Sequence, residues 1–398
     1  MNPIVVHKYG GSSLADLDRV RAVARRIADT VADGRRVVAV VSAMGKTTDE
    51  LLARAKGLAA NPNPRELDML LSTGERVSTA LLAIALGELG VLAVSFTGSQ
   101  SGVITNTRHN RARIIEVRPY RVLDELDAGK VVIIAGYQGV SYAREITTLG
   151  RGGTDTTAVA MAAALGAEYC EICSDVDGVY TADPRVVPEA RRLDALDHDA
   201  MVALARHGSR VLNQDCVEYA SRRGVAIFAK STFGPRDDAG TVVRVNPGHE
   251  GSPVTAIAHR VRLGELTLAA GQDAGVLLEE MDRLGVYAET MSGGGDEALR
   301  LSFPLDDAHR LEALQTRLGE VFGAAVSTRT DRGSVTVVGH GLGDEPALLR
   351  RVLATAREVA QAPCPLHLGP LAAALTVPGP AVEPLVRRLH AELLGGPQ

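Results

Sequence analysis

Short apolar strand patterns alternate with longer helical patterns along residues 1–233, and this alternation limits the possible folds more than any other feature of the sequence. Strands are predicted at residues 4–9, 36–42, 91–96, 130–138 and 168–174. Helices are predicted between them, at residues 14–31, 49–60, 65–90, 154–166 and 197–223. Such alternation is typical of an α/β fold with a mostly parallel sheet and helices on both faces. Ligands of these sheets bind beyond the carboxyl ends of the strands.

Three glycine-containing turns follow predicted strands and are therefore candidate ligand-binding segments. The most informative one, residues 147–158, reads Thr-Thr-Leu-Gly-Arg-Gly-Gly-Thr-Asp-Thr-Thr-Ala and leads directly into a helix. Its glycines allow backbone N–H groups to approach an anion, and the helix N-terminus adds positive potential. The guanidinium of Arg151 suits a carboxylate or a phosphate. We therefore expect this turn to bind a small anion.

The other two turns each contain a lysine, a residue that this chain uses sparingly. Only Lys8, Lys46, Lys56, Lys130 and Lys230 are lysines among 43 basic residues. Lys8 and Lys230 lie at the ends of predicted strands, Lys230 in a further strand at residues 226–231, and an ammonium group there could neutralise a phosphoryl group. Lys56 and Lys130 are interpreted as solvated charges. By itself, the turn after Lys8 could equally be an ordinary strand–helix connection, because it matches neither the Walker motif nor the dinucleotide-binding glycine motif.

Composition and charge narrow the class of protein. A chain of 398 residues exceeds one hydrophobic core, so two or three domains are expected. A formal net charge of −5 without a basic run counts against nucleic acid or an anionic membrane as a partner. We identify no apolar stretch of membrane-spanning length and no signal peptide, and four cysteines suggest a reducing compartment, so the expected location is cytoplasmic. Cys170 and Cys173 are interpreted as strand core positions, with redox or zinc chemistry as the alternative.

The last third of the chain has a different organisation. Residues 234–253 are rich in Gly, Pro, Asp and Asn and predict a linker with an edge strand at 241–245. Beyond it, residues 266–278 and 335–349 form a weak repeat, each copy reading as strand, acidic turn and helix. Two small α+β units would fill this region. Because no cluster of titratable residues stands out there, we interpret it as a regulatory or interface module.

Seven ordered motifs give the chain a close resemblance to the aspartate kinases, which have the amino-acid-kinase fold followed by a tandem of ACT-like domains. The motifs are Lys8-Tyr-Gly-Gly-Ser-Ser, Val41-Ser-Ala-Met-Gly-Lys-Thr-Thr-Asp-Glu-Leu, Thr73-Gly-Glu-Arg-Val-Ser, Phe96-Thr-Gly-Ser-Gln, Thr147-Thr-Leu-Gly-Arg-Gly-Gly-Thr-Asp-Thr-Thr, Ser174-Asp-Val-Asp-Gly-Val-Tyr-Thr-Ala-Asp-Pro-Arg and Gly208-Ser-Arg-Val-Leu. The resemblance is dense over residues 3–245. It implies a catalytic domain at 1–245, an ACT-like domain at 253–330 and a divergent second one at 331–398.

The resemblance implies that the γ-phosphoryl group of Mg-ATP is transferred to the side-chain carboxylate of L-aspartate, which gives 4-phospho-L-aspartate. An ionised carboxylate needs positioning and charge neutralisation more than a general base. The implied catalytic residues are Lys8 at the phosphoryl group, Arg151 at a substrate carboxylate, and Asp155, which orients both. The implied substrate-binding residues are Ser42, Thr47, Thr48, Glu75, Arg151, Gly152, Gly153 and Thr154. The implied ATP-binding residues are Lys8, Tyr9, Gly10, Gly11, Ser174, Asp175, Tyr180, Asp183, Arg185, Arg210 and Lys230. Magnesium is expected on the ATP phosphates, without protein ligands.

Simpler interpretations stay open for several of these positions. Glu75 and the arginine after it could form a surface pair on a helix. Asp175 and Asp177 resemble half of a calcium loop, although its spacing and terminal glutamate are missing. Asp183 and Pro184 could merely begin a turn.

Parts of the chain also depart from the aspartate kinase pattern. The segment 199–209 lacks acidic residues that are usual there, and residues 213–214 and Lys230 differ as well. In the ACT-like region, the turns 272–275 and 344–347 lack the Asp-x-Pro-Gly sequence, and Pro363 and Pro365 disfavour a central strand. We therefore predict weak or no inhibition by lysine plus threonine. The ACT-like modules are still expected to form a homodimer or a higher homo-oligomer.

Two rival functions remain at this stage. The first is a kinase of the same fold that acts on a modified aspartate, glutamate or a carbamate. The second is a non-catalytic regulatory subunit, which the presence of Lys8, Arg151 and Asp155 disfavours.

Overall fold

The protein packs as two compact units. The computed structural model describes residues 2–150, 152–245, 253–306 and 311–395. The first unit contains Met1–Val179, Arg192–Val202 and Arg210–Gly248, and the second contains Tyr180–Arg191, Ala203–Ser209 and His249–Gln398. Segments 180–191 and 203–209 therefore pack with the C-terminal part of the chain, although they precede the linker. The three-domain division drawn from the sequence remains a prediction.

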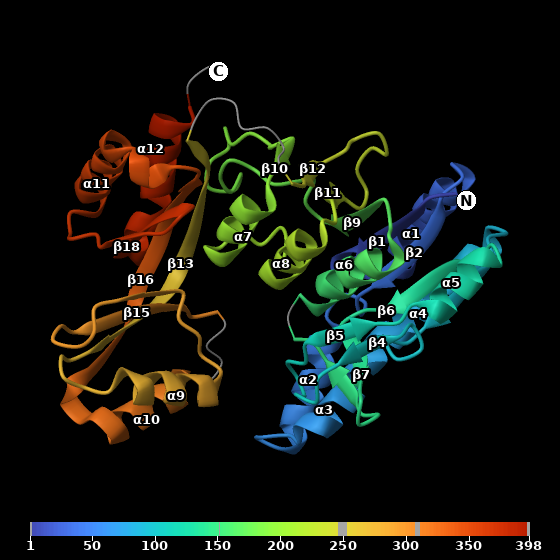
Figure 1. Ribbon diagram of the computed structural model, residues 1–398, viewed down its shortest axis with the longest axis horizontal. Helices are drawn as coiled ribbons and strands as arrows, with labels where there is room; N and C mark the ends of the chain where they lie inside the picture. Colours follow the sequence, from blue (N-terminus) through green and yellow to red (C-terminus); the bar gives the residue numbers. More distant parts are fainter. Residues whose placement is uncertain (1, 151, 246–252, 307–310, 396–398) are drawn as a thin grey trace. The chain divides into compact units, whose positions relative to one another are not determined.

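An eight-stranded sheet forms the centre of the first unit (Figure 1). Its strand order is β10-β12-β11-β9-β1-β2-β6-β3, and all neighbouring strands are parallel except β11 and β12. The bounds are β1 (Ile4–Tyr9), β2 (Arg36–Val41), β3 (Ala93–Phe96), β6 (Val131–Ala135), β9 (Tyr169–Ser174), β10 (Ala195–Leu196), β11 (Ile227–Ser231) and β12 (Thr241–Val243). The predicted mostly parallel sheet is confirmed. The strand predicted at the edge, β12, instead lies between β11 and the two-residue β10.

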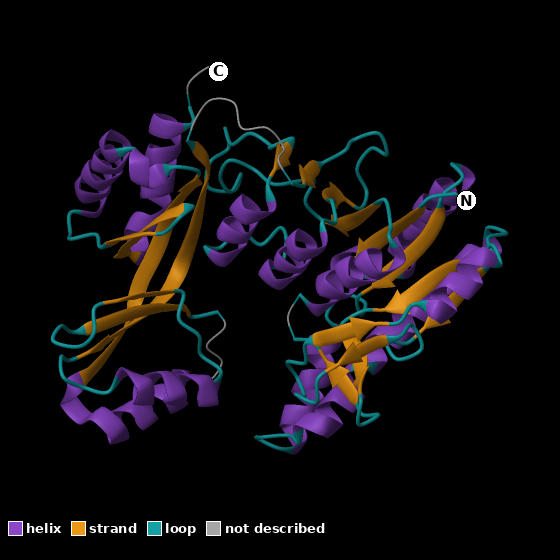
Figure 2. Cartoon of the chain, viewed as in Figure 1, coloured by secondary structure: helices purple, strands orange, loops and turns teal. Residues whose placement is uncertain are grey.

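Helices cover both faces of this sheet, as predicted (Figure 2). On one face, α1 (Leu17–Ala32) and α4 (Thr73–Glu88) pack against alternate strand residues such as Val37 and Ile133. On the other face, α6 (Gly153–Leu165) packs against β1, β2 and β9 and against α8 (Gln214–Arg223). Successive strand side chains point to opposite faces, which explains why β2 and β6 are apolar at nearly every position. The remaining helices of the N-terminal half are α2 (Thr47–Leu58), α3 (Pro64–Leu71) and α5 (Tyr120–Asp127).

Three predicted elements are broken in the structure. The helix predicted at 65–90 is divided at Ser72 into α3 and α4. The helix predicted at 197–223 is divided into α7 (His198–Arg206) and α8, because Gly208 adopts a φ of 120° and Asn213 caps the start of α8. The strand predicted at 130–138 ends at Ala135, and its last residue begins a strand of another sheet.

A second, four-stranded sheet in the first unit was not predicted. Its order is β5-β4-β7-β8. The bounds are β4 (Val103–Thr105), β5 (Ile114–Val117), β7 (Gln138–Ser141) and β8 (Ile146–Thr148). Strand β8 leads directly into the glycine turn before α6. This small sheet therefore positions the segment that the sequence marks as anion-binding.

The segment Pro64–Glu88, which joins α3 and α4, is long and apolar enough to cross a membrane by length and composition. The sequence prediction that no such stretch exists is wrong on this criterion. In the structure, 44% of its most apolar window is buried inside the protein. Leu82 and Leu86 pack into the same cluster as Val23 and Ile27 of α1. This packing is that of a core helix.

The second unit contains a six-stranded antiparallel sheet with the order β14-β15-β13-β16-β18-β17. The bounds are β13 (Val254–Leu268), β14 (Thr290–Ser292), β15 (Leu299–Pro304), β16 (Val326–Gly339), β17 (Leu366–Leu368) and β18 (Ala372–Pro378), with helices α9 (Ala274–Leu284), α10 (Leu311–Phe322), α11 (Pro346–Ala360) and α12 (Val382–Leu393). Both repeat copies are strand, turn and helix, as predicted. The prolines at 363 and 365 precede β17, which is an edge strand.

This second unit has two hydrophobic cores. One joins the end of β13 and β15 to α9 and α10. The other joins β16 and β18 to α11 and α12, and it includes Ala182, Val186 and Val187 from the segment 180–191. The same segment is also hydrogen-bonded to β13, because the backbone N–H of Ile257 donates to the carbonyl of Thr181. Segment 180–191 is thus part of the core of the second unit.

Candidate active site

Three turns of the first unit meet around a cavity of about 330 Å³. The turns follow β1, β2 and β8, and the cavity also reaches the first turn of α4. The lining residues are Lys8, Gly10, Gly11, Ser42, Ala43, Gly45, Thr48, Glu75, Tyr137, Gly150, Gly152, Gly153, Thr154 and Asp155. Most of them were singled out from the sequence. Ala43, Gly45, Tyr137 and Gly150 were not assigned a role there.

Lys8 and Asp155 form an ion pair inside the cavity. Lys8 lies near the end of β1 and Asp155 in the first turn of α6, and the distance from Nζ to Oδ1 is 2.7 Å. Both residues are 9% exposed. A Cβ atom at Gly10 would lie 3.3 Å from the Lys8 ammonium, so glycine leaves the approach to this group open. The pair therefore fixes the position of the Lys8 ammonium at the N-terminus of α6, where backbone N–H groups also favour an anion.

Glu75 is the most unusual acidic residue of the cavity. It is 2% exposed, so the interpretation as half of a surface pair is wrong. Its Oε1 accepts a hydrogen bond from the backbone N–H of Ala43 at 3.1 Å. Among the described residues, its buried Oε2 has no hydrogen-bond partner. Burial raises the pKa of Glu75 from 4.5 to about 7. A cationic group of a ligand would satisfy this oxygen.

The glycine turn before α6 needs glycine at two positions. Gly150 and Gly152 have φ values of 83° and 71°. A Cβ atom at Gly152 would also lie 2.1 Å from Nδ2 of Asn213. Asn213 accepts hydrogen bonds from Asp215 N and Cys216 N and so caps α8, which holds its side chain against the turn. Arg151 lies outside the described residues, and its role remains a prediction.

The turn after β2 contributes hydroxyl groups and backbone. Ser42 donates to the hydroxyl of Thr154 at 3.0 Å, which joins this turn to α6. Thr48 lines the cavity. Thr47 does not, and its hydroxyl donates to the carbonyl of Met44. A Cβ atom at Gly11 would lie 2.8 Å from the carbonyl oxygen of Ala43, so glycine permits close packing of the two turns.

Tyr9 and Lys230, which the resemblance assigns to ATP binding, do not line the cavity. The side chain of Tyr9 is fully buried in the hydrophobic core, and burial raises its pKa, so a side-chain contact with a nucleotide is not supported. Lys230 is 8% exposed and does not line the cavity. Its ammonium is 3.3 Å from Glu171 Oε1 and donates to the carbonyl of Arg236. Both assignments were implied by the family resemblance, and a role of Lys230 at the nucleotide remains a prediction.

Glu171 is the centre of a buried charge cluster that the sequence did not suggest. Arg26 contacts it at 3.3 Å, and the ring of His7 lies 3.6 Å away. Burial acts to raise the pKa of Glu171, but His7, Lys230 and Arg26 outweigh it and lower the pKa. The available signal was a glutamate within the otherwise apolar strand β9. The cluster joins β1, β9 and β11, and none of its residues lines the cavity.

The other residues assigned to the nucleotide are divided between the units. Ser174 ends β9, Asp175 follows it in the first unit, and Arg210 also belongs to the first unit. Tyr180, Asp183 and Arg185 belong to the second unit.

The simpler interpretations of two acidic positions can be compared with the structure. Asp183 accepts from the backbone N–H and the guanidinium of Arg185, as expected for a turn, and these hydrogen bonds lower its pKa. Asp177 contacts Arg192 at 3.4 Å.

Cys170 and Cys173 are both fully buried in β9, as the core-strand interpretation predicts. The described residues contain no group of three His, Cys, Asp or Glu side chains that could hold a metal ion.

Comparison with known proteins agrees with this geometry. Residues 3–230 match the amino acid kinase family. The chain belongs to this family. Within it, an aspartokinase from Mycolicibacterium smegmatis is 43% identical over 360 residues, which cover 87% of this chain and 85% of that relative. An aspartokinase from Thermus thermophilus is 42% identical over 354 residues, 86% of this chain and 87% of that relative.

Solved structures of this family agree in fold. The crystal structure of Escherichia coli aspartokinase III in complex with aspartate and ADP matches with a TM-score of 0.83 and 25% identity. The match covers 98% of this chain and 99% of that one. The α/β fold and the resemblance to aspartate kinases, both predicted from the sequence, are confirmed.

Proposed function

We propose that the protein is an aspartate kinase that transfers the γ-phosphoryl group of ATP to the side-chain carboxylate of L-aspartate. The observation that carries the proposal is the cavity in which the Lys8 ammonium and the buried Glu75 carboxylate are held on separate turns. An α-amino acid fits this arrangement, because its ammonium would satisfy the unpartnered Oε2 of Glu75. The family relatives are named aspartokinases, and one of them was solved with aspartate and ADP.

The residues of the cavity supply position and charge. An oxygen of the aspartate side chain bonds to the γ-phosphorus while the bond from this phosphorus to the β,γ-bridging oxygen breaks, which gives 4-phospho-L-aspartate and ADP. No proton has to move, since the carboxylate is ionised at neutral pH. Lys8, oriented by Asp155, neutralises negative charge on the transferring phosphoryl group. The backbone N–H groups in the first turn of α6 stabilise the same charge. Glu75 holds the substrate ammonium, and Arg151 is assigned to the α-carboxylate.

ATP and Mg²⁺ belong to this proposal. The glycines beside the Lys8 ammonium fit the approach of a phosphate group, because a Cβ atom at Gly10 would crowd the ammonium at 3.3 Å. Mg²⁺ would be bound through the phosphates and would offset part of their charge. Gly10, Gly11 and Lys8 would lie at the phosphates, whereas Ser174, Asp175, Tyr180, Asp183, Arg185 and Arg210 are retained as nucleotide-side candidates.

The remaining parts of the proposal concern the context of the enzyme. A cytoplasmic location and a homodimer or higher homo-oligomer through the ACT-like modules are proposed. The product would feed pathways that start from aspartate semialdehyde. Weak or absent inhibition by lysine plus threonine is also proposed, since the turns 272–275 and 344–347 differ from the aspartate kinase pattern. An initial-rate assay with both amino acids at millimolar concentration tests this point, and strong inhibition would refute it.

A screen of the common amino acids for ADP release, with hydroxylamine trapping of the acyl phosphate, tests the main proposal. Trapping with aspartate alone is the expected result. Trapping with several acids would favour the rival kinase of relaxed or different specificity. No turnover with any acceptor, together with no difference between wild type and Lys8→Ala, would favour the rival regulatory subunit.

A further inference from the structure

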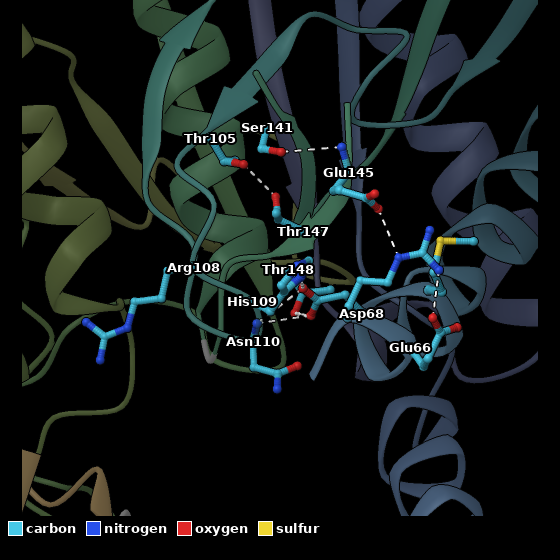
Figure 3. Close-up of polar contacts among 12 residues, drawn as sticks. Glu66, Asp68, Thr105, Arg108, His109, Asn110, Ser141, Glu145, Thr147 and Thr148 are labelled. Atoms are coloured by element: carbon cyan, nitrogen blue, oxygen red, sulfur yellow. Dashed lines mark hydrogen bonds and ion pairs between the residues drawn. The ribbon is translucent and has the colours of Figure 1, made fainter. Parts of the chain in front are cut away.

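Asp68 on α3 is a fully buried carboxylate that lies outside the lining of the cavity. Figure 3 shows that side chains and backbone from separate segments converge on it. The Thr148 hydroxyl donates to Oδ1 at 2.5 Å, and Nδ1 of His109 donates to Oδ2 at 2.6 Å. The backbone N–H of Asn110 donates to the same carboxylate at 3.1 Å. Its acceptors are therefore well satisfied.

Burying the Asp68 carboxylate costs free energy, although it joins three segments: α3, β8 and the loop with His109 and Asn110. Removing a charge from water is unfavourable unless hydrogen bonds replace the lost hydration, and well-packed apolar side chains often stabilise a fold as well or better. Satisfied buried polar networks do fix geometry, however, because each donor must lie at one distance and angle. The question is therefore which geometry Asp68 fixes.

Thr148 connects Asp68 to the cavity along β8. Gly150, two residues later, lines the cavity and begins the glycine turn before α6. Tyr137, another lining residue, is joined to the same strand end, because the backbone N–H of Leu149 donates to the carbonyl of Tyr137 at 2.9 Å. Tyr137 itself has a φ of 66°, an uncommon conformation that needs support from its surroundings.

The loop that carries His109 and Asn110 lies directly against the glycine turn. A Cβ atom at Gly150 would be 3.4 Å from the carbonyl oxygen of Asn110. The loop is also fixed to β8, because the backbone N–H of Ala112 donates to the carbonyl of Thr148. Asp68 thus holds both the strand that leads into the turn and the loop that supports it.

The third segment held by Asp68 is its own helix, which leads into the residue assigned to the substrate ammonium. After α3, the chain turns at Ser72 and begins α4, where Glu75 reaches the cavity. The carbonyl of Ser72 accepts a hydrogen bond from Nε2 of Gln138, the neighbour of Tyr137. Glu75 and the glycine turn line different sides of the cavity. Asp68, which does not line the cavity, connects the segments that carry them.

We propose that Asp68 is a positioning residue for acceptor binding: through Thr148 and His109, it sets the glycine turn and Tyr137 at the correct distance from Glu75. This inference rests on the proposed kinase function. It assigns no contact between Asp68 and either substrate. Loss of the network should weaken binding of the amino acid more than binding of ATP, because the Lys8 turn after β1 is not attached to it.

A pair of substitutions at Thr148 isolates the network. Thr148→Val keeps the shape of the side chain and removes the hydroxyl, whereas Thr148→Ser keeps the hydroxyl. We expect Thr148→Val to raise the KM for aspartate about tenfold, since it removes the hydroxyl donor of a buried carboxylate, and to change the KM for ATP by less than about twofold. Thr148→Ser should remain close to wild type. His109→Gln, at a partly exposed position, should raise the KM for aspartate several-fold and keeps the test available if Thr148→Val does not fold.

Glu145→Gln provides the matched control. Glu145 accepts from Arg65 at 2.9 Å and joins the same helix α3 to the β7–β8 hairpin, but at the surface. This variant should keep both KM values, because exposed ion pairs contribute little. The inference is overturned if folded Thr148→Val and His109→Gln lower only the melting temperature, or raise both KM values equally. If the wild type itself forms no acyl phosphate from aspartate, the proposed function fails instead, and the two failures are distinguishable.

Discussion

The buried carboxylate of Glu75 should make the ligand-free protein less stable as the pH rises. Its pKa is raised from 4.5 to about 7 by burial, so the folded state holds the proton more tightly than the unfolded state. The stability associated with the proton is fully present below pH 4.5 and is lost as the pH rises to about 7. A shift of this size corresponds to about 3 kcal/mol.

Glu75→Gln tests this reasoning, because the amide keeps an oxygen for the Ala43 N–H and cannot ionise. We expect the variant to gain about 2–3 kcal/mol over the wild type between pH 5 and pH 8. Urea unfolding followed by circular dichroism at several pH values gives this difference. Glu88→Gln, an exposed position on the same helix, should show no such trend.

The same substitution should damage function while it stabilises the fold. Without the carboxylate, the KM for aspartate should rise at least tenfold, since a charge-assisted contact to the ammonium is lost. In the wild type, the KM for aspartate should fall as the pH rises through about 7, because the ionised form of Glu75 binds the ammonium. A stability difference between variant and wild type that is equal at pH 5 and pH 8 would refute the assignment of a raised pKa.

Three further outcomes are expected. Lys8→Ala should lower kcat about 10²–10³-fold, whereas Lys56→Ala at an exposed position should not; equal rates for both variants would contradict the role of Lys8. Gly152→Ala should destabilise the protein by more than ~1 kcal/mol, because of its φ of 71° and the close side chain of Asn213, and Asn213→Ala should relieve part of the loss in thermal unfolding. Leu82→Ala should cost about 2–5 kcal/mol in unfolding free energy and leave both KM values unchanged in the folded enzyme.

The turns of the active site could be predicted because their chemistry is local. Lys8 before two glycines, and Asp155 behind a glycine–arginine turn, are recognisable within a few residues. Ligands bind at the carboxyl ends of parallel strands, and this rule predicts from the sequence that the turns lie close together. Glu75 was identified only through the family resemblance, since burial of one helical position depends on what packs against it.

The residues that could not be predicted act through contacts between distant parts of the chain. Asp68 meets His109 and Thr148 across 41 and 80 positions in sequence, and no local pattern marks such a meeting. The small sheet β5-β4-β7-β8 was missed because three- and four-residue strands show no periodicity. The burial of the Tyr9 side chain and the ion pair of Lys230 with Glu171 could not be predicted, because a strand sequence gives the alternation of faces but not which face is covered.

The packing of residues 180–191 with the C-terminal half has a consequence for dissecting this protein. A recombinant fragment that begins at residue 249 would lack the Thr181 carbonyl beside β13 and would expose the apolar surface that Ala182, Val186 and Val187 cover. Such a fragment should aggregate or remain partly unfolded, even though it contains the helices α9 to α12. A soluble C-terminal half would instead require residues 180–191 to be joined ahead of residue 249.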